Sequence, residues 1–150
     1  MSYENVVVGT DGSPTAELAV RHAANLALDT SARLVVVTAY EPHGDELVEK
    51  ESHAPEDIRW ALTDRVQAEE RGRRGRTIAR EVGAKGVVTQ AIAGSPADVL
   101  LEAAGDFGAD LIVVGSVGLT GASRLIHLGS VASAIGHHAP CDVLIVHTTT

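Results

Sequence analysis

The sequence predicts an α/β fold: an open, five-stranded parallel sheet with helices on both faces, in three layers. Five short runs rich in Val and Ile recur along the chain, and most are continuous, as in strands buried on both faces of a parallel sheet. Segments with helical patterns separate these runs, which is the order expected for a sheet with right-handed crossovers. The 150 residues, of which 45% are hydrophobic, suffice for a single domain over 1–150.

The first two strands flank a helix with a clear start. The first strand is expected at Asn5–Gly9 and the second at Leu34–Tyr40. Between them, Ser13 is a favoured N-cap residue and Pro14 fits the first helical position, so a helix is expected from there to about Thr30.

An acidic segment and a long helix come next. Glu41–Asp57 carries seven acidic residues and one basic residue, Lys50, and it is either a solvated surface loop or a flap over a site. Ile58–Val82 has apolar or small residues at helical spacing. Gly72 and Gly75 either weaken this helix or let it lie close to the sheet.

The remaining elements continue the alternation of strands and helices. Ser95 and Pro96 repeat the start signal of the first helix, and Pro140 stops the last one. In chain order these elements are a strand at Val87–Ala93, a helix from Ser95 to near Gly108, a strand at Leu111–Gly115, a helix at Ser130–His138 and a strand at Val143–His147.

Composition and charge argue against several classes of function. The net charge of −8 disfavours DNA or RNA as a partner, because affinity for a phosphate backbone needs a basic surface. No apolar run approaches the roughly 20 residues of a membrane span, and the first residues carry no signal-peptide pattern. The single Cys141 fits a reducing compartment, so we expect a cytoplasmic protein. From the charge and the apolar runs together, we expect neither nucleic-acid nor membrane partners.

Three strand ends carry glycines, and in a parallel sheet they meet at one edge. They are Gly9–Ser13, Ala93–Pro96 and Gly115–Ser130. In open α/β sheets, ligands bind at the carboxyl ends of the strands, where the strand order reverses. Gly115–Gly118 lets backbone N–H groups approach an anion, and a helix that begins at Ser130 adds unpaired donors. The sequence therefore predicts a nucleotide site.

The side chains near these glycines favour binding over catalysis. Asp11 either binds a ribose hydroxyl or a metal ion held by phosphates, or it only caps the first helix together with Ser13. No lysine follows a glycine loop, so a phosphate would rest on backbone N–H groups, the Ser116 and Ser130 hydroxyls and Arg124. Phosphoryl transfer usually needs a more concentrated positive charge than this. The seven histidines lack metal-ligand spacing, so no resident metal site is expected.

Four segments that span essentially the whole chain carry a family resemblance. They are Val7–Ser13, Ala93–Pro96, Gly115–Ser130 and Ala139–His147. In this order and combination they resemble the universal stress protein family, specifically its nucleotide-binding branch. The start GTDGS and the ending DVLIVHTT look most like the actinobacterial members, some of which bind cyclic AMP.

The resemblance implies a Rossmann-like fold with strand order 3-2-1-4-5 and a ligand at its switch point, between Asp11 and Gly115. It implies that Asp11 faces the ribose or a magnesium ion carried by the nucleotide, and that the backbone at Ala39 recognises adenine. The other positions that it implies for the nucleotide are Gly9, Thr10, Gly94, Pro96, Gly115, Ser116, Gly118, Gly129, Ser130 and Val131.

The phosphate loop departs from the family signature by one residue. That signature is G-x2-G-x9-G-[ST], whereas ten residues separate Gly118 from Gly129 in this chain. The extra residue is either absorbed near Thr120 and Gly121 or shifts Gly129 away from the phosphates. A cyclic nucleotide makes fewer demands on the far end of this loop than a triphosphate does.

The resemblance thus leads us to expect an ATP-binding stress protein that acts as a binder or sensor and has little or no enzymatic activity. The alternatives are a cyclic AMP-binding member, a slow ATPase and a protein-interaction module without a ligand. The resemblance also implies a homodimer through the last strand, Val143–His147. Such pairing would cover an apolar edge strand that is prone to aggregate when it is exposed.

Overall fold

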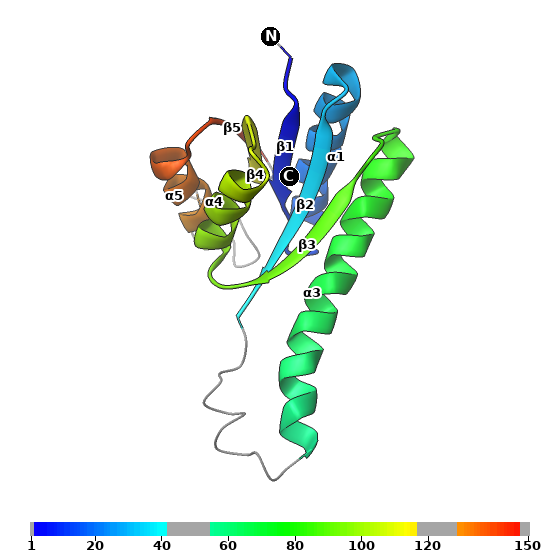
Figure 1. Cartoon of the computed structure of the whole chain (residues 1–150), viewed down its shortest axis with the longest axis vertical. Coiled ribbons are helices and arrows are strands. Elements are labelled where there is room, and N and C mark those ends of the chain that lie inside the picture. Colours follow the sequence, from blue (N-terminus) through cyan, green and yellow to red (C-terminus); the bar gives the residue numbers. More distant parts are fainter. Residues whose placement is uncertain (1, 42–54, 117–128, 148–150) are drawn as a thin grey trace.

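The structure is a computed structural model that describes residues 2–41, 55–116 and 129–147, and within residues 55–63 only the backbone. Strands and helices alternate along the described chain (Figure 1). The strands are β1 (Asn5–Gly9), β2 (Arg33–Tyr40), β3 (Val88–Ala93), β4 (Leu111–Gly115) and β5 (Asp142–Val146). The helices are α1 (Pro14–Thr30), α3 (Pro55–Val82), α4 (Pro96–Asp106) and α5 (Ser130–His138). None of the helices in these ranges is long and apolar enough to span a membrane.

The five strands form one parallel sheet in the order β3-β2-β1-β4-β5, which confirms the predicted fold class and strand order. The central strand β1 pairs with β2 on one side and with β4 on the other, so that Val7 lies opposite both Val35 and Ile112. The strand order therefore reverses at β1 and β4. In Figure 1, α1 and α3 cover one face of this sheet and α4 and α5 cover the other.

Each face of the sheet has its own hydrophobic core. Val6 and Val8 of β1 pack toward α1 and α3, whereas Val7, between them, packs toward α4 and α5. All three valine side chains are fully buried. This double burial explains why the strands appear in the sequence as continuous aliphatic runs rather than as alternating ones.

Gly75 lets α3 lie close to the sheet, which decides between the two interpretations for this glycine. A Cβ atom on Gly75 would stand only 2.9 Å from Val36 Cγ1 of β2, and one on Gly72 would stand 3.5 Å from Thr89 Cβ of β3. The two glycines lie three residues apart and so share one face of the helix. The missing side chain of Gly75 therefore sets the distance between α3 and the sheet, whereas a Cβ on Gly72 would make only ordinary contacts.

The predicted boundaries differ from the structure at a few ends. The largest difference is at α3, which begins at Pro55 rather than at Ile58. Proline fits the first turn of a helix and acidic residues are favourable there, so the last residues of the acidic segment are helical and not loop. Residues 42–54 of that segment, and with them the choice between loop and flap, lie outside the described residues. At the chain end, β5 is Asp142–Val146, one residue earlier than predicted, and His147 follows the strand.

Candidate functional site

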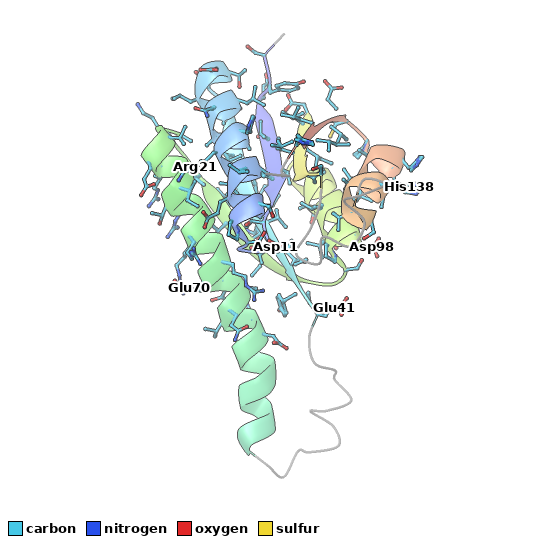
Figure 2. The ribbon with its side chains drawn as sticks, turned by 180° about the vertical axis from the view of Figure 1, so that it is seen from behind. Asp11, Arg21, Glu41, Glu70, Asp98 and His138 are labelled. Atoms are coloured by element: carbon cyan, nitrogen blue, oxygen red, sulfur yellow. The ribbon has the colours of Figure 1, made fainter. Side chains whose placement is uncertain are left out.

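A cavity of about 180 Å³ lies at the carboxyl edge of the sheet. The ends of β1, β2 and β4 meet the first turns of α1, α4 and α5 there, so the cavity occupies the switch point of the strand order. Asp11, Glu41 and Asp98 all lie toward this edge in Figure 2. The lining residues are Gly9, Thr10, Asp11, Ala16, Val37, Ala39, Pro96, Leu100, Val114, Gly115, Gly129, Ser130, Val131 and Ala132.

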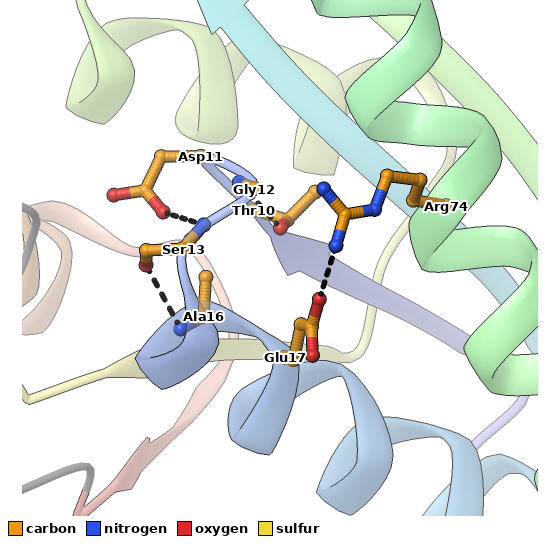
Figure 3. Close-up of polar contacts among 7 residues, drawn as sticks. All are labelled: Thr10, Asp11, Gly12, Ser13, Ala16, Glu17 and Arg74. Atoms are coloured by element: carbon orange, nitrogen blue, oxygen red, sulfur yellow. Dashed lines mark hydrogen bonds and ion pairs between the residues drawn. The ribbon is translucent and has the colours of Figure 1, made fainter.

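The turn between β1 and α1 holds Asp11 over the sheet edge. The Thr10 N–H donates to the Val37 carbonyl at 3.0 Å, which extends the ladder between β1 and β2 by one bond. The Gly12 N–H donates to Thr10 Oγ1 at 3.1 Å, and the Ser13 N–H donates to Asp11 Oδ1 at 2.9 Å (Figure 3). Gly12 has φ +81°, a conformation that favours glycine. These bonds leave Asp11 Oδ2 without a hydrogen-bond partner among the described residues.

Asp11 and Ser13 have different roles in this turn. Ser13 is the N-cap of α1, because its Oγ accepts the Ala16 N–H at 3.1 Å, and it does not line the cavity (Figure 3). Asp11 stabilises the turn through one carboxylate oxygen and lines the cavity. The capping interpretation therefore holds for Ser13, whereas Asp11 is also placed to meet a ligand.

The end of β4 and the start of α5 supply a second wall. The Ser116 N–H donates to the Val146 carbonyl at 2.8 Å, and the Gly129 N–H donates to the Ser116 carbonyl at 2.7 Å. These bonds fix Gly129 at the N-cap of α5, where no side chain caps the helix. The first N–H groups of a helix have no acceptor within the helix, and here residues 130–132 border the cavity. This wall suits an anion, because unpaired N–H groups and the positive end of the helix dipole meet there.

The third wall comes from β2 and α4. Ala39 and Val37 line it from β2, and Pro96 and Leu100 line it from the first turns of α4. Gly94 connects the strand β3 to this helix with φ +142°, and its N–H donates to the Tyr40 carbonyl at 2.9 Å. The wall is apolar, so it suits a flat hydrophobic group such as a base.

The electrostatics of the cavity are simple. Among the described lining residues, only Asp11 has an ionisable side chain. No group of three His, Cys, Asp or Glu side chains in the described part of the chain could hold a metal ion. A phosphate in this cavity would therefore be held by backbone N–H groups and hydroxyls, and a cation would need the ligand itself to complete its coordination.

The structure brings nine of the twelve predicted nucleotide-binding residues to this one cavity. Ser116 is buried beside the cavity and orients Gly129 through its carbonyl, and Gly94 shapes the turn before α4 without lining the cavity. Gly118, Arg124 and the inserted position lie outside the described residues. The lining predicted residues are Gly9, Thr10, Asp11, Ala39, Pro96, Gly115, Gly129, Ser130 and Val131.

Five lining residues were not predicted from the sequence, and all are apolar. Two of them follow from simple periodicity, since Val37 shares a strand face with Ala39 and Leu100 lies one helical turn after Pro96. The other three have no comparable local signal because neighbouring elements position them: Ala16, Val114 and Ala132.

Comparison with known proteins places the whole chain in one group. A family model described as the universal stress protein family matches residues 2–147. Universal stress protein Rv1636 of Mycobacterium tuberculosis is 40% identical over 149 residues, which cover 99% of each chain. The predicted resemblance to actinobacterial members is thereby confirmed.

Two solved structures of similar proteins are complexes with adenine nucleotides. A universal stress protein in complex with cAMP has 35% sequence identity and a TM-score of 0.71, covering 99% of this chain and 100% of that one. A universal stress protein from Archaeoglobus fulgidus in complex with dAMP has 26% identity and a TM-score of 0.68, covering 97% of this chain and 98% of that one.

Proposed function

The chain belongs to the universal stress protein family, and from this premise we propose that it binds an adenine nucleotide in the cavity at the carboxyl edge of its sheet. We place adenine against the apolar wall at Ala39, the ribose at Asp11, and the phosphates at Gly115, Gly129 and Ser130. From the sequence signature, we assign Gly118 to the same phosphate site.

One observation carries this proposal: three walls of different chemistry meet around a single cavity. The apolar wall from β2 and α4 suits a base, and the carboxylate of Asp11 suits a sugar hydroxyl. The first turn of α5 suits a phosphate. A nucleotide has three parts that match these walls, in the order base, sugar and phosphate. The cAMP and dAMP complexes of similar proteins support the choice of adenine.

We propose ATP as the first candidate ligand and cyclic AMP as the second. The glycines of the phosphate signature, Gly115, Gly118 and Gly129, favour a triphosphate, with magnesium carried by the nucleotide and Asp11 beside it. The ten-residue spacing before Gly129 favours the smaller cyclic nucleotide. The 35% identical relative in complex with cAMP supports the same alternative.

We further propose that the protein is a cytoplasmic binder or sensor in the stress response, rather than an efficient enzyme. The described cavity lining contains no lysine, arginine or histidine that could stabilise a transferring phosphoryl group or move a proton. We expect ATP turnover to be absent or slower than about one per second. Faster hydrolysis that Asp11→Ala abolishes would favour the enzyme.

We also propose a homodimer in which β5 pairs with its copy. This strand is at one end of the sheet, and its side chains at Val143, Leu144 and Ile145 are only partly buried. Two such strands related by a two-fold axis would run antiparallel and cover each other. Wild-type protein that sediments as a monomer at tens of micromolar would refute the dimer.

Titration calorimetry with ATP and magnesium, AMP, cyclic AMP and GTP tests the nucleotide site. We expect heat of binding with adenine nucleotides, and Asp11→Ala should weaken it by about 1–2 kcal/mol, the value of a hydrogen bond to a sugar hydroxyl. Asp98→Ala is the matched control, because Asp98 is an exposed carboxylate at the same edge that does not line the cavity. No heat with any adenine nucleotide would overturn the proposal.

A further inference from the structure

Leu100 of α4 lies over the end of the central strand β1, at the border of the cavity. A Cβ atom on Gly9 would stand 2.9 Å from Leu100 Cδ1 and 3.1 Å from Cδ2, so the leucine methyl groups occupy the space where a side chain at Gly9 would lie. Both residues line the cavity, and Leu100 is only 4% exposed. Gly9 ends β1 without a positive φ. The contact with Leu100, rather than backbone conformation, therefore explains the glycine at this position.

Leu100 shares an apolar surface of the cavity with two strand residues. Val37 of β2 and Val114 of β4 line the cavity from the strands on either side of β1, and both side chains are almost fully buried. All three residues belong to the core between the sheet and the helices α4 and α5. Such cores are close-packed, so the open space beside Leu100 is the cavity itself. The Leu100 methyl groups therefore limit how far the cavity extends toward β1.

We propose that Leu100, positioned over Gly9, is a specificity-determining residue that sets the size of the base that the cavity accepts. The inference rests on the proposed placement of adenine against the wall from β2 and α4, to which Leu100 belongs. A C–H edge of adenine fits against methyl groups. A larger substituent on the same edge overlaps with them, and a buried core side chain yields little to such overpacking.

The missing side chain of Gly9 is part of the same arrangement. Alanine at this position would displace the Leu100 methyl groups, and the open space beside them is the cavity. A displaced Leu100 therefore moves toward the base and makes the site smaller. Gly9→Ala thus weakens nucleotide binding through Leu100, which differs from a direct contact between residue 9 and the nucleotide.

The first test removes the Leu100 methyl groups and enlarges the base. Titration calorimetry would compare ATP with analogues that carry a benzyl group on N6, a methylthio group on C2 or a bromine on C8, in wild type, Leu100→Ala and Leu100→Val. The same substituents on cyclic AMP serve if wild type binds that nucleotide more tightly. Leu101→Ala is the matched control, because Leu101 is a partly buried leucine of the same helix that does not line the cavity. Circular dichroism and thermal unfolding would establish that each variant is folded.

We expect wild type to bind at least one analogue about tenfold or more weakly than the parent nucleotide, and Leu100→Ala to remove most of that difference. Leu101→Ala should keep the wild-type ratios. Analogues that all bind wild type as tightly as the parent nucleotide, or ratios that Leu100→Ala leaves unchanged, would overturn the role of Leu100. If Leu100→Ala does not fold, Leu100→Val decides by the same ratios. Wild type that binds neither ATP nor cyclic AMP would instead refute the proposed function.

The second test is a double-mutant cycle between Gly9 and Leu100, which measures whether the two positions act together. We expect Gly9→Ala to weaken the parent nucleotide by at least about fivefold in wild type, because it moves Leu100 toward the base. In the Leu100→Ala background the loss should be less than about twofold, because no methyl groups remain to be displaced. No loss in wild type, or an equal loss in both backgrounds, would overturn the coupling between Gly9 and Leu100.

Discussion

Gly75→Ala tests whether the missing side chain at this position sets the distance between α3 and the sheet. Two effects oppose each other. Alanine favours a helix interior over glycine by about 1 kcal/mol. However, its Cβ would stand 2.9 Å from Val36 Cγ1, well inside the ~3.5–4.0 Å at which carbon atoms attract each other.

The contact with Val36 decides the sign. Val36 is fully buried in β2, and its β-branched side chain has little freedom to move. Overpacking of a core costs about 1–3 kcal/mol, and the upper part of that range applies where the neighbour cannot yield. After subtraction of the helix preference, we expect Gly75→Ala to lower the free energy of unfolding by about 1–2 kcal/mol.

Urea denaturation followed by far-ultraviolet circular dichroism measures this change. The matched control is Gly136→Ala in α5, where the new Cβ meets nothing within 4 Å, so we expect a gain of up to about 1 kcal/mol. Gly72→Ala should also gain up to about 1 kcal/mol, because its contacts of 3.5 Å or more are ordinary. Gly75→Ala that is as stable as Gly136→Ala would refute the account of how α3 packs.

Three further changes test other parts of the structure. Thr38→Val should raise stability by about 1 kcal/mol in urea denaturation, because the buried Thr38 hydroxyl has no hydrogen-bond partner among the residues that the structure describes; a loss would show that this hydroxyl is satisfied. Ser13→Ala should lower stability by about 1 kcal/mol through loss of the α1 cap, with Ser95→Ala, whose side chain makes no cap bond, as the near-neutral control. The hydrogen bond from Tyr3 to Asp142 raises the pKa of the tyrosine above 10.0, so its contribution to stability is present below that pH and is lost as the pH rises through the folded-state value. Tyr3→Phe should therefore show a weaker decline of the urea midpoint above pH 10 than wild type, and equal declines would contradict the role of this bond.

The fold was predictable because its signals are local. The aliphatic runs of β1, β2 and β4 are continuous since both faces of each strand are buried, and Ser13 with Pro14 marks the start of α1. The same proline signal begins α3 at Pro55, but the acidic residues around it resemble a surface loop. The predicted start of α3 is therefore too late, because the acidic composition of this segment indicates a loop more strongly than Pro55 indicates a helix.

The candidate site was predictable only in part, because its walls come from different elements. The glycines and Asp11 stand out in the sequence, since each follows a strand at the edge where ligands bind. Ala16 and Ala132 are ordinary small helical residues in the sequence, and only the packing of α1 and α5 brings them to the cavity. Arg71 of α3 occupies the space where a side chain on Gly12 would lie, and no local pattern indicates this because the two residues belong to different elements.

The central claim is that an adenine nucleotide occupies the cavity at the carboxyl edge, and an NMR titration of the ¹⁵N-labelled protein tests it most directly. With ATP or cyclic AMP, we expect saturable shifts of backbone amides concentrated at Asp11, Gly115 and residues 129–132. A separate hollow lies between α1 and α3 at Glu17, Arg73 and Arg74. Shifts centred on that hollow, or no shifts at saturating nucleotide, would contradict the account.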